Sequence, residues 1–502
     1  MTSSADVPLY HNIECGAGTS NSIILPEAEA QLAKCLLHDA EHDLHILDLQ
    51  IAQLCEQREQ DAARLNRLRI AVAPHKHLPA EILSHIFRLS AGEDEIDIPL
   101  RTSPYPPQWV LRQVSSRWRH IVLNDRHLWN NISINLETED EGWESEYLQR
   151  ISLDISGFLL PIILPTTGPL TMTVRSNGSR DHAKKVLNVL LEPYGSQIVD
   201  LYLCLPGHTF NQFFKTLPSK FTALESLDLE FLDSPSSGTV NELRAFPPSL
   251  RKLEITGDIS AIWSFGSHEI DWKRLTDINF SDISNGTLFQ IHSILQRCIN
   301  LRTCSITALG TLVGAPPSVH MNLPYLQSLS ITMDTGSVFN FFTLPSLECL
   351  QVSNRVTKLP VAEITSMVNR SACVLRTLAL YGDHPLGALY DPVILDTMFT
   401  AMLSLLEFRA SIVPPREILE KIGEGSLLPN LEALECDLDA ETASVFIEVV
   451  ERRVRDVPLG GLREALGTYP KDLFDTNEMK GLLVRARNLR RNGRSVRLLA
   501  SI

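Results

Sequence analysis

The chain has 502 residues, a length that allows two to four domains or one long array of repeats. Hydrophobic residues make up 44% of it and charged residues 21%, a composition that is typical of folded proteins and excludes a largely disordered chain. The formal net charge of −15 argues against general affinity for nucleic acids or for an acidic membrane surface.

Cysteine usage and the N-terminal residues indicate the cytoplasm or the nucleus, or both. The nine cysteines are scattered and form no C-x-x-C pair, so we interpret them as reduced residues. The first ten residues have neither a basic start nor an apolar run, and we therefore expect no signal peptide. The most apolar segment, 158–164, is interrupted by Pro161 and is too short to span a bilayer.

After a polar segment, 1–26, that we expect to be disordered, residues 27–72 predict one long coiled-coil helix. No Gly or Pro occurs from Glu27 to Ala71. Apolar residues recur with heptad spacing over about four heptads. One core position holds Leu37, Leu44, Ile51 and Leu65, with Arg58 interrupting, and the other holds Leu47, Leu54 and Leu68, with Asp61 interrupting. Two interpretations remain open: self-association or a partner helix, and a helix folded back onto its own domain.

The same helix contains a motif that is also found in zinc proteases. His38, Glu41 and His42 match H-x-x-E-H, and His45 follows one turn later. Two histidines four residues apart on a helix can share a metal ion. The heptad spacing places these histidines away from the apolar stripe, so we expect adventitious metal binding at most and assign no catalytic or metal site.

Residues 75–130 predict a small helical domain. Two segments, beginning at Leu78 and near Trp109, each carry an apolar helical face, and the stretch between them, 91–108, is acidic and then proline-rich, which indicates a long loop. Such short helices cannot bury this many large apolar groups among themselves. The segment therefore predicts a module that docks on a neighbouring domain or on another protein.

These residues resemble the F-box, the helical motif that binds the Skp adaptor of cullin-based SCF ubiquitin ligases. The match comprises Leu78, Pro79, Glu81, Ile82, Leu83, Ile86, Phe87, Val114, Arg117, Trp118, Arg119, Leu128 and Trp129. Two departures are Ser115, where cysteine is usual, and the long loop, which resembles fungal F-box proteins with an N-terminal coiled coil. The alternative is an ordinary helical subdomain packed on its own core. The resemblance assigns adaptor binding to Leu78, Pro79, Ile82, Leu83, Ile86, Phe87, Val114, Trp118, Leu128 and Trp129.

A different periodicity, L-x-x-L-x-L, covers residues 131–442. It recurs about every 26 residues, a period that is typical of leucine-rich repeats. The triplets are Leu224/Leu227/Leu229, Leu250/Leu253/Ile255, Leu275/Ile278/Phe280, Leu301/Cys304/Ile306, Leu326/Leu329/Ile331, Leu347/Leu350/Val352, Leu375/Leu378/Leu380, Leu403/Leu406/Phe408 and Leu431/Leu434/Cys436, with earlier candidates at Trp129/Ile132/Ile134, Leu148/Ile151/Leu153 and Ile198/Leu201/Leu203. We expect an α/β solenoid with parallel strands in one sheet. The alternative is an α/β domain with evenly spaced strands.

Strand alternation predicts which side chains line the concave face of this solenoid. The residue between the two buried positions is polar in most repeats. The candidate target-binding residues are Asp228, Glu254, Asn279, Gln351 and Glu407. The stripe suits a polar or basic partner, and the alternative is a face that is simply solvated.

Residues 443–502 predict a helical cap and a basic tail. Six arginines occur between Arg485 and Arg497, interleaved with apolar residues. The interleaving favours a packed cap over a nuclear import signal or an RNA contact.

The repeat family places Asn or Cys at a ninth position, which here holds Asp258, Asp334, Asp383 and Asp439 in some repeats.

Together the resemblances imply a non-catalytic substrate receptor, without a cofactor, that docks a Skp-type adaptor and through it the cullin ligase core. The repeat arc would hold a protein target whose identity the sequence does not give. The alternatives are a repeat scaffold without ligase association and a metallohydrolase using His38, Glu41 and His42. We found no P-loop, dinucleotide-binding turn, nucleophile elbow or kinase motifs.

Overall fold

The computed structural model divides the chain into two compact units, Met1–His85 and Ile86–Ile502. The residues that it describes are 26–72, 74–92, 95–98, 106–136, 168–176, 194–206, 210, 219–232, 246–257, 271–283, 288–308, 320–332, 336–354, 359–382, 391–456, 461–471, 476–491 and 495–500. The predicted triplet Leu148/Ile151/Leu153 and the aspartates Asp258, Asp334 and Asp383 lie outside these residues, as does almost all of segment 1–26.

The first unit contains the predicted long helix, α2 (Glu27–Ala71), of 45 residues. Pro26 precedes it, Glu27 and Glu29 lie in its first turn and Arg69 lies in its last, an arrangement that complements the helix dipole. None of its residues is buried. A 3-10 turn, η2 (Pro74–Lys76), follows, and then α3 (Ala80–Ala91) begins.

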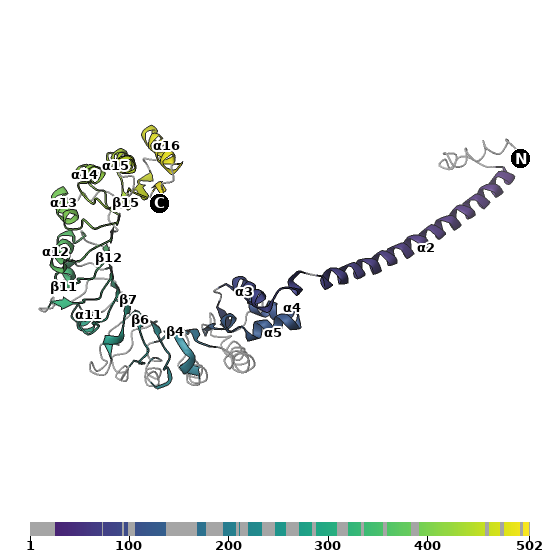
Figure 1. Cartoon of the computed structure of the whole chain (residues 1–502). Helices are drawn as coiled ribbons and strands as arrows, with labels where there is room; N and C mark the ends of the chain where they lie inside the picture. The colour runs from purple at the N-terminus through teal and green to yellow at the C-terminus, as the bar shows by residue number, and fades with distance from the viewer. Residues whose placement is uncertain are drawn as a thin grey trace. The chain divides into compact units, whose positions relative to one another are not determined.

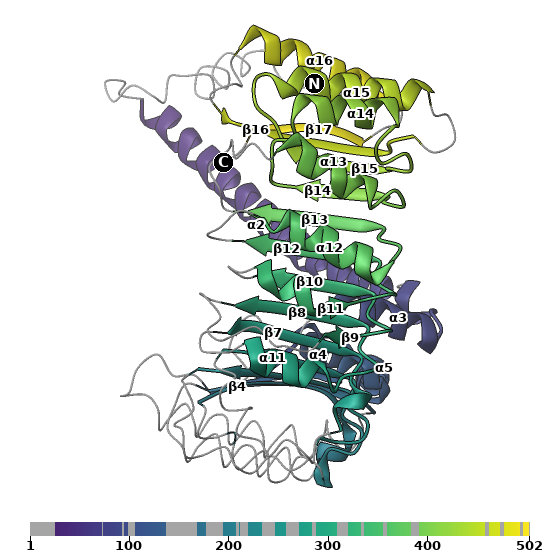
Figure 2. The same ribbon diagram turned by 90° about the vertical axis from the view of Figure 1, so that its left-hand side faces the viewer.

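The second unit begins with short helices and continues as one sheet. The helices are the end of α3, then α4 (Pro107–Val114), α5 (Ser116–Asn124) and the 3-10 turn η3 (Arg126–Leu128). Within the described residues the sheet has fifteen strands, every neighbouring pair of which is parallel. Strands lie side by side in sequence order, as Figure 2 shows. The predicted α/β fold with a parallel-strand solenoid is therefore confirmed.

The strands of this sheet are β1 (Ile96–Ile98), β2 (Asn131–Asn135), β3 (Leu170–Arg175), β4 (Ile198–Leu205), β5 (Ser226–Phe231), β6 (Lys252–Thr256), β7 (Asp277–Ile283), β8 (Thr303–Ala308), β10 (Ser328–Thr332), β12 (Cys349–Asn354), β13 (Thr377–Gly382), β14 (Glu407–Ala410), β15 (Ala433–Asp437), β16 (Glu464–Tyr469) and β17 (Ser495–Ala500). Two further strands, β9 (Met321–Asn322) and β11 (Phe342–Thr343), form a separate parallel pair.

Within the second unit the strands line the inner side of an arc and the helices lie outside it (Figure 1). The outer helices and turns are η6 (Gly195–Gln197), η7 (Trp272–Arg274), α11 (Leu288–Leu295), η8 (Gly336–Phe341), α12 (Val361–Ser371), α13 (Pro392–Thr400), α14 (Arg416–Glu424), α15 (Thr442–Asp456) and α16 (Asn477–Arg491). The predicted core residues Leu227, Leu253 and Ile278 are buried and in register on neighbouring strands. The core thus lies between the sheet and the outer segments, one layer per repeat.

One predicted repeat is out of register. The triplet Leu403/Leu406/Phe408 placed Leu406 on a strand, but Leu406 precedes β14 and is only half-buried. Phe408 pairs with Leu378, which makes the true buried set Leu405, Phe408 and Ala410. The prediction failed because a run of leucines in this segment fits the pattern in more than one alignment.

The sheet also extends beyond the predicted repeats at both ends. Strand β1 lies within the segment 91–108 that was predicted as a loop, and β16 and β17 lie within the predicted helical cap. The cap helices α15 and α16 are present, but they alternate with these strands. Val496 and Leu498 of β17 are buried, so the C-terminal segment continues the solenoid.

Side-chain hydrogen bonds join consecutive repeats. In several repeats, the residue just before the first buried leucine is a Ser or Asn that donates to a main-chain carbonyl of the preceding repeat. Ser249 Oγ donates to the Leu224 carbonyl at 2.7 Å, and Asn300 Nδ2 donates to the Lys273 carbonyl at 2.7 Å. Ser346, Ser404 and Asn430 make the equivalent bonds to Pro324, Leu375 and Leu403. Asp439, at the predicted ninth position, instead accepts from the Thr442 backbone N–H at the start of α15.

Candidate functional site: the helical domain and the repeat face

The residues predicted to bind an adaptor separate into buried and exposed groups. Four of them, Leu83, Phe87, Leu128 and Trp129, are buried within the chain. Pro79, Ile82, Ile86 and Val114 are exposed, and Leu78 and Trp118 are half-buried. The buried four therefore shape the domain, whereas the exposed ones are available to a partner. This separation between the two faces of a short helix was not evident from the sequence.

An aromatic cluster holds the helices α3, α4 and α5 together. The rings of Phe87 and Trp118 lie with centroids 4.7 Å apart, and those of Trp109 and Trp129 meet edge to face at 6.2 Å. The indole N–H of Trp129 donates to the Val122 carbonyl at 2.7 Å, which satisfies its one polar atom inside the core. Large aromatic side chains from separate segments thus pack together in one small core.

Ser115, one of the two departures from the usual F-box pattern, has a structural role. It is extended, terminates α4 and caps α5, and its Oγ accepts a hydrogen bond from the Trp118 backbone N–H at 3.1 Å. Serine is a strong N-cap residue because its hydroxyl satisfies one of the free donors of the first helical turn. The substitution is therefore compatible with the helix pair.

The long loop, the other departure, supplies the first strand of the sheet. Ile96 and Ile98 of β1 are buried and pair in parallel with Ile132 and Ile134 of β2. The strand β2 begins two residues after Trp129. From α3 onward, the helical domain is thus continuous with the solenoid through shared main-chain hydrogen bonds.

Exposed apolar side chains remain on α3 and α4 of the helical domain. Ile86 is 42% exposed and Leu89 is 71% exposed on α3, while Val110 and Val114 are each 53% exposed on α4. Residues three or four apart lie on the same side of a helix, so each helix presents an apolar stripe. Leu89 and Val110 were not among the predicted contacts, although their spacing from Ile86 and Val114 was visible in the sequence.

The predicted target-binding residues lie on the inner face of the sheet. Asp228, Glu254 and Asn279 are in register on β5, β6 and β7, and Asn279 Nδ2 donates to Glu254 Oε1 at 2.5 Å. Gln351 occupies the same row on β12. Glu407 also lies on this face but two positions earlier in its strand, where it pairs with Thr377. We expected Glu407 in register with Gln351, but Arg409 occupies that position on β14, paired with Ala379 and Glu435.

The acidic part of this face is partly desolvated. Burial, and then the nearby carboxylates of Glu254 and Glu230, raise the pKa of Asp228 to about 7. The Tyr202 hydroxyl donates to Glu230, and the Arg175 guanidinium lies 5.3 Å from the centre of the Tyr202 ring. The face at β5 and β6 therefore brings the carboxylates of Asp228, Glu230 and Glu254 together, a grouping that suits a cationic partner.

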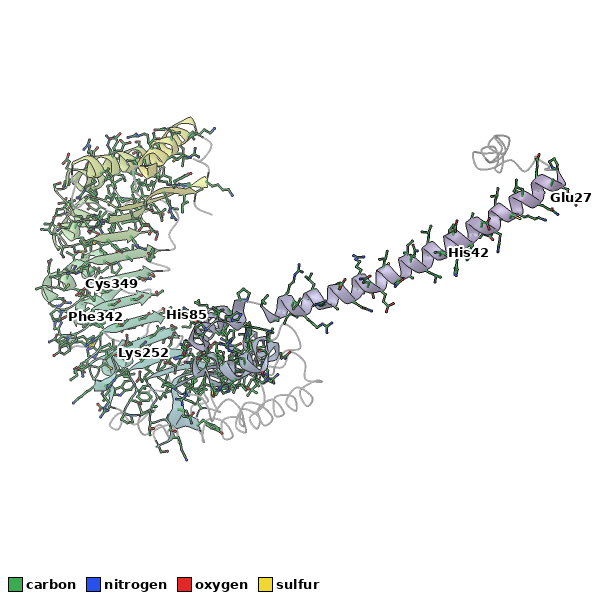
Figure 3. All side chains as sticks on the ribbon, turned by 45° about the vertical axis from the view of Figure 1, so that its right-hand side comes forward. Glu27, His42, His85, Lys252, Phe342 and Cys349 are labelled. Atoms are coloured by element: carbon green, nitrogen blue, oxygen red, sulfur yellow. The ribbon has the colours of Figure 1, made fainter. Side chains whose placement is uncertain are left out.

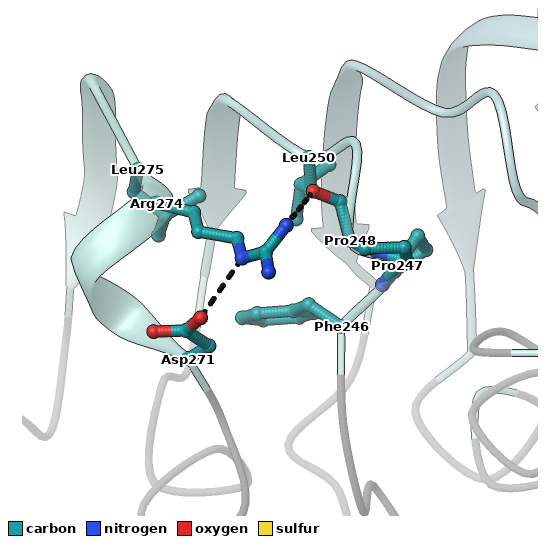
Figure 4. A pocket seen from close by; sticks show the side chains of 7 residues that line it. All are labelled: Phe246, Pro247, Pro248, Leu250, Asp271, Arg274 and Leu275. Carbon is teal, nitrogen blue, oxygen red and sulfur yellow. Dashed lines mark hydrogen bonds and ion pairs between the residues drawn. The ribbon is translucent and has the colours of Figure 1, made fainter.

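A small cavity of about 170 Å³ opens beside the start of β6, and Figure 4 shows the side chains that line it. Its charged groups are Asp271 and Arg274. The Arg274 Nε donates to Asp271 at 2.8 Å, and a terminal guanidinium nitrogen donates to the Pro248 carbonyl at 2.8 Å. Phe246 and Leu250 supply apolar walls. Because Arg274 links two repeats, we interpret this cavity as part of the seam between them.

The residues of the H-x-x-E-H motif lie on α2 and are all exposed. Figure 3 shows the side chains of this helix, including Glu27 and His42, pointing outward on all sides. Among the described residues, no group of three or more His, Cys, Asp or Glu side chains is arranged to hold a metal ion. No described helix is both long and apolar enough to cross a membrane.

Comparison with known proteins identifies the helical domain. A family model described as F-box-like matches residues 75–135, a range that includes α3, β1, α4, α5 and β2. Residues 75–135 therefore form an F-box-like domain. No curated protein matches the chain. A crystal structure of a Bacteroides fragilis protein is similar, with 12% identity, a TM-score of 0.26, and coverage of 72% of this chain and 84% of that one.

Proposed function

We propose that the chain is a substrate receptor of an SCF-type ubiquitin ligase, built from an F-box and leucine-rich repeats of the fungal type. The observation that carries the proposal is the F-box-like domain with apolar side chains exposed on α3 and α4. An exposed apolar stripe on a folded protein is typical of a binding surface for a partner. Here the partner is a Skp-type adaptor, which connects the receptor to the cullin core.

In this proposal, the exposed and the buried residues of the domain have different roles. Ile82, Ile86 and Val114 contact the adaptor, together with Pro79, and Leu89 and Val110 extend the same two helix faces. The buried aromatic cluster fixes the helices that present them. Truncating a contact residue should weaken adaptor binding without unfolding the domain, whereas truncating a buried one should do both.

The repeat face holds the protein target. Its acidic stretch at β5 and β6 favours a target with lysine or arginine at the contact. The chain itself is non-catalytic, and its contribution is proximity, since a bound target is held near the ubiquitin-charged enzyme at a high effective concentration. The receptor acts in the cytoplasm, the nucleus or both.

Co-purification of the adaptor with full-length chain variants tests this function. Ile86→Glu and Val114→Glu each place a charge on an exposed apolar stripe and should reduce adaptor recovery at least tenfold. Val484→Glu is a matched control, because Val484 on α16 is also 53% exposed. Recovery equal to wild type with both variants would refute the adaptor contact and favour a repeat scaffold without ligase association.

A further inference from the structure

The long helix α2 carries an apolar seam, interrupted by Arg58 and Asp61, that the first unit leaves uncovered. The seam residues are between 50% and 64% exposed, and they are Leu37, Leu44, Leu47, Ile51, Leu54, Leu65 and Leu68. Helices in proteins gain most of their stability from packing of an apolar face, and heptad spacing matches packing against a second helix. The seam therefore predicts an occupant of helical form.

The order of seam residues favours a second copy of α2 that runs antiparallel. We centre that arrangement on the middle of the helix. Residues at the first core position of one copy, such as Leu44 and Ile51, then face residues at the second core position of the other copy, such as Leu54 and Leu47. Leu44 then faces Leu54 of the second copy, and Ile51 faces Leu47. The two charged seam residues face apolar ones, Arg58 opposite Ala40 and Asp61 opposite Leu37. A parallel pair instead stacks Arg58 on Arg58 and Asp61 on Asp61.

Charges beside the seam favour the same direction. The stretch Glu27–Asp48 holds six acidic residues and one lysine, whereas the last ten residues of α2 hold three arginines and no acid. Antiparallel packing places Glu27 near Arg69 of the second copy and Glu29 near Arg64. Parallel packing brings Arg64 near Arg69 and Asp43 near Asp48 of the other chain, and like charges at such positions are unfavourable.

We propose that α2 mediates an antiparallel homodimer of this chain. The helix is about 68 Å long at 1.5 Å per residue, so the two C-terminal ends of α2 lie about that far apart. Each chain continues from that end into its own F-box-like domain. The inference rests on α2 alone and does not depend on adaptor binding.

Disulfide trapping in the full-length chain tests both association and direction. The exposed Cys35 and Cys55, together with Cys15, are first replaced by serine. Leu37→Cys and Asp61→Cys are then made separately in chains that carry different tags. Antiparallel packing predicts that neither variant forms a disulfide dimer alone and that an equimolar mixture forms the mixed dimer under mild oxidation.

Each other result contradicts the proposal. Self-linked dimers of Leu37→Cys alone would show parallel packing, because the two introduced thiols lie about 36 Å apart in the antiparallel arrangement. No disulfide in any sample, with a monomer mass of the unmodified full-length chain by light scattering, would show that the chain does not self-associate. Leu44→Glu should convert the wild-type dimer to monomer and provides the negative control for trapping.

Discussion

Arg88 on α3 and Asp125, which follows α5, form a bidentate ion pair. Arg88 Nε lies 2.9 Å from Asp125 Oδ2, and the terminal guanidinium nitrogen lies 2.9 Å from Oδ1. The Asp125 side chain is only 4% exposed and also accepts from the His127 backbone N–H, at the start of η3. The pair therefore joins two segments of the F-box-like domain that are far apart in the sequence.

We expect Asp125→Ala to destabilise this domain by about 1–3 kcal/mol, because it leaves the His127 N–H and the Arg88 guanidinium without their acceptor. Urea unfolding followed by tryptophan fluorescence measures the change, since Trp109, Trp118 and Trp129 lie in the same domain. Glu420→Ala, which breaks an exposed pair with Arg416, should change stability by less than about 0.5 kcal/mol. Equal effects of the two variants would contradict the assigned role of Asp125.

A buried arginine stabilises the turn between α14 and β15. Arg453 is 2% exposed and donates to the carbonyls of Ile422, Leu427, Leu428 and Pro429. Arg453→Met should leave these buried acceptors unsatisfied and lower stability by about 2–4 kcal/mol, as measured by thermal unfolding. Arg452→Met, at an exposed neighbour, should be close to neutral. A stable Arg453→Met variant would show that water replaces the guanidinium.

The raised pKa of Asp228 predicts a pH dependence of stability. The folded chain holds the Asp228 proton up to about pH 7, whereas the unfolded chain loses it near the ordinary pKa of 3.8. The stability contributed by this proton is therefore present at low pH and is lost as the pH rises from about 4 to above 7. Asp228→Asn should raise the melting temperature at pH 8 and change it little at pH 4.

Gln351→Ala, at an exposed neutral residue on the same face, is the control for that measurement. Because it removes no titratable group, its melting temperature relative to wild type should be the same at pH 4 and pH 8. An Asp228→Asn variant that behaves like this control would mean that solvent reaches Asp228 more freely than its position on the face indicates.

The periodic parts of the chain were predictable, and the parts that depend on exact alignment were not. Leu227, Leu253 and Ile278 repeat at a spacing that fixes both the strand and its buried side. In contrast, this segment fits the pattern in two alignments, Leu403/Leu406/Phe408 and Leu405/Phe408/Ala410. Only packing against the neighbouring strands selects the second alignment. The strand β1 was missed because three residues among prolines and acids carry too weak a pattern.

The candidate adaptor surface was predictable only as a set of residues. The motif named Phe87 and Ile86 together, but helix geometry buries the first and exposes the second. The role of Arg453 was not predictable, because its four carbonyl partners come from another repeat. Sequence patterns identify apolar periodicity well and long-range polar contacts poorly.

The proposed α2 dimer predicts the sign of a charge reversal. Arg64→Glu places the introduced carboxylate beside that of Glu29 of the second copy in the antiparallel arrangement and should raise the dimer dissociation constant about two- to fivefold. The same change would strengthen a parallel dimer, because residue 64 then lies near Arg69. Adding Glu29→Arg should restore wild-type association in sedimentation equilibrium measurements.

Direct titration of the purified full-length chain with a purified Skp-type adaptor tests the central claim. Isothermal titration calorimetry should show saturable binding with one adaptor per chain and a negative heat-capacity change, since apolar surface is buried on binding. The Val114→Glu variant should bind at least tenfold more weakly and unfold at the wild-type temperature. Absence of binding by the folded wild-type chain would contradict the account.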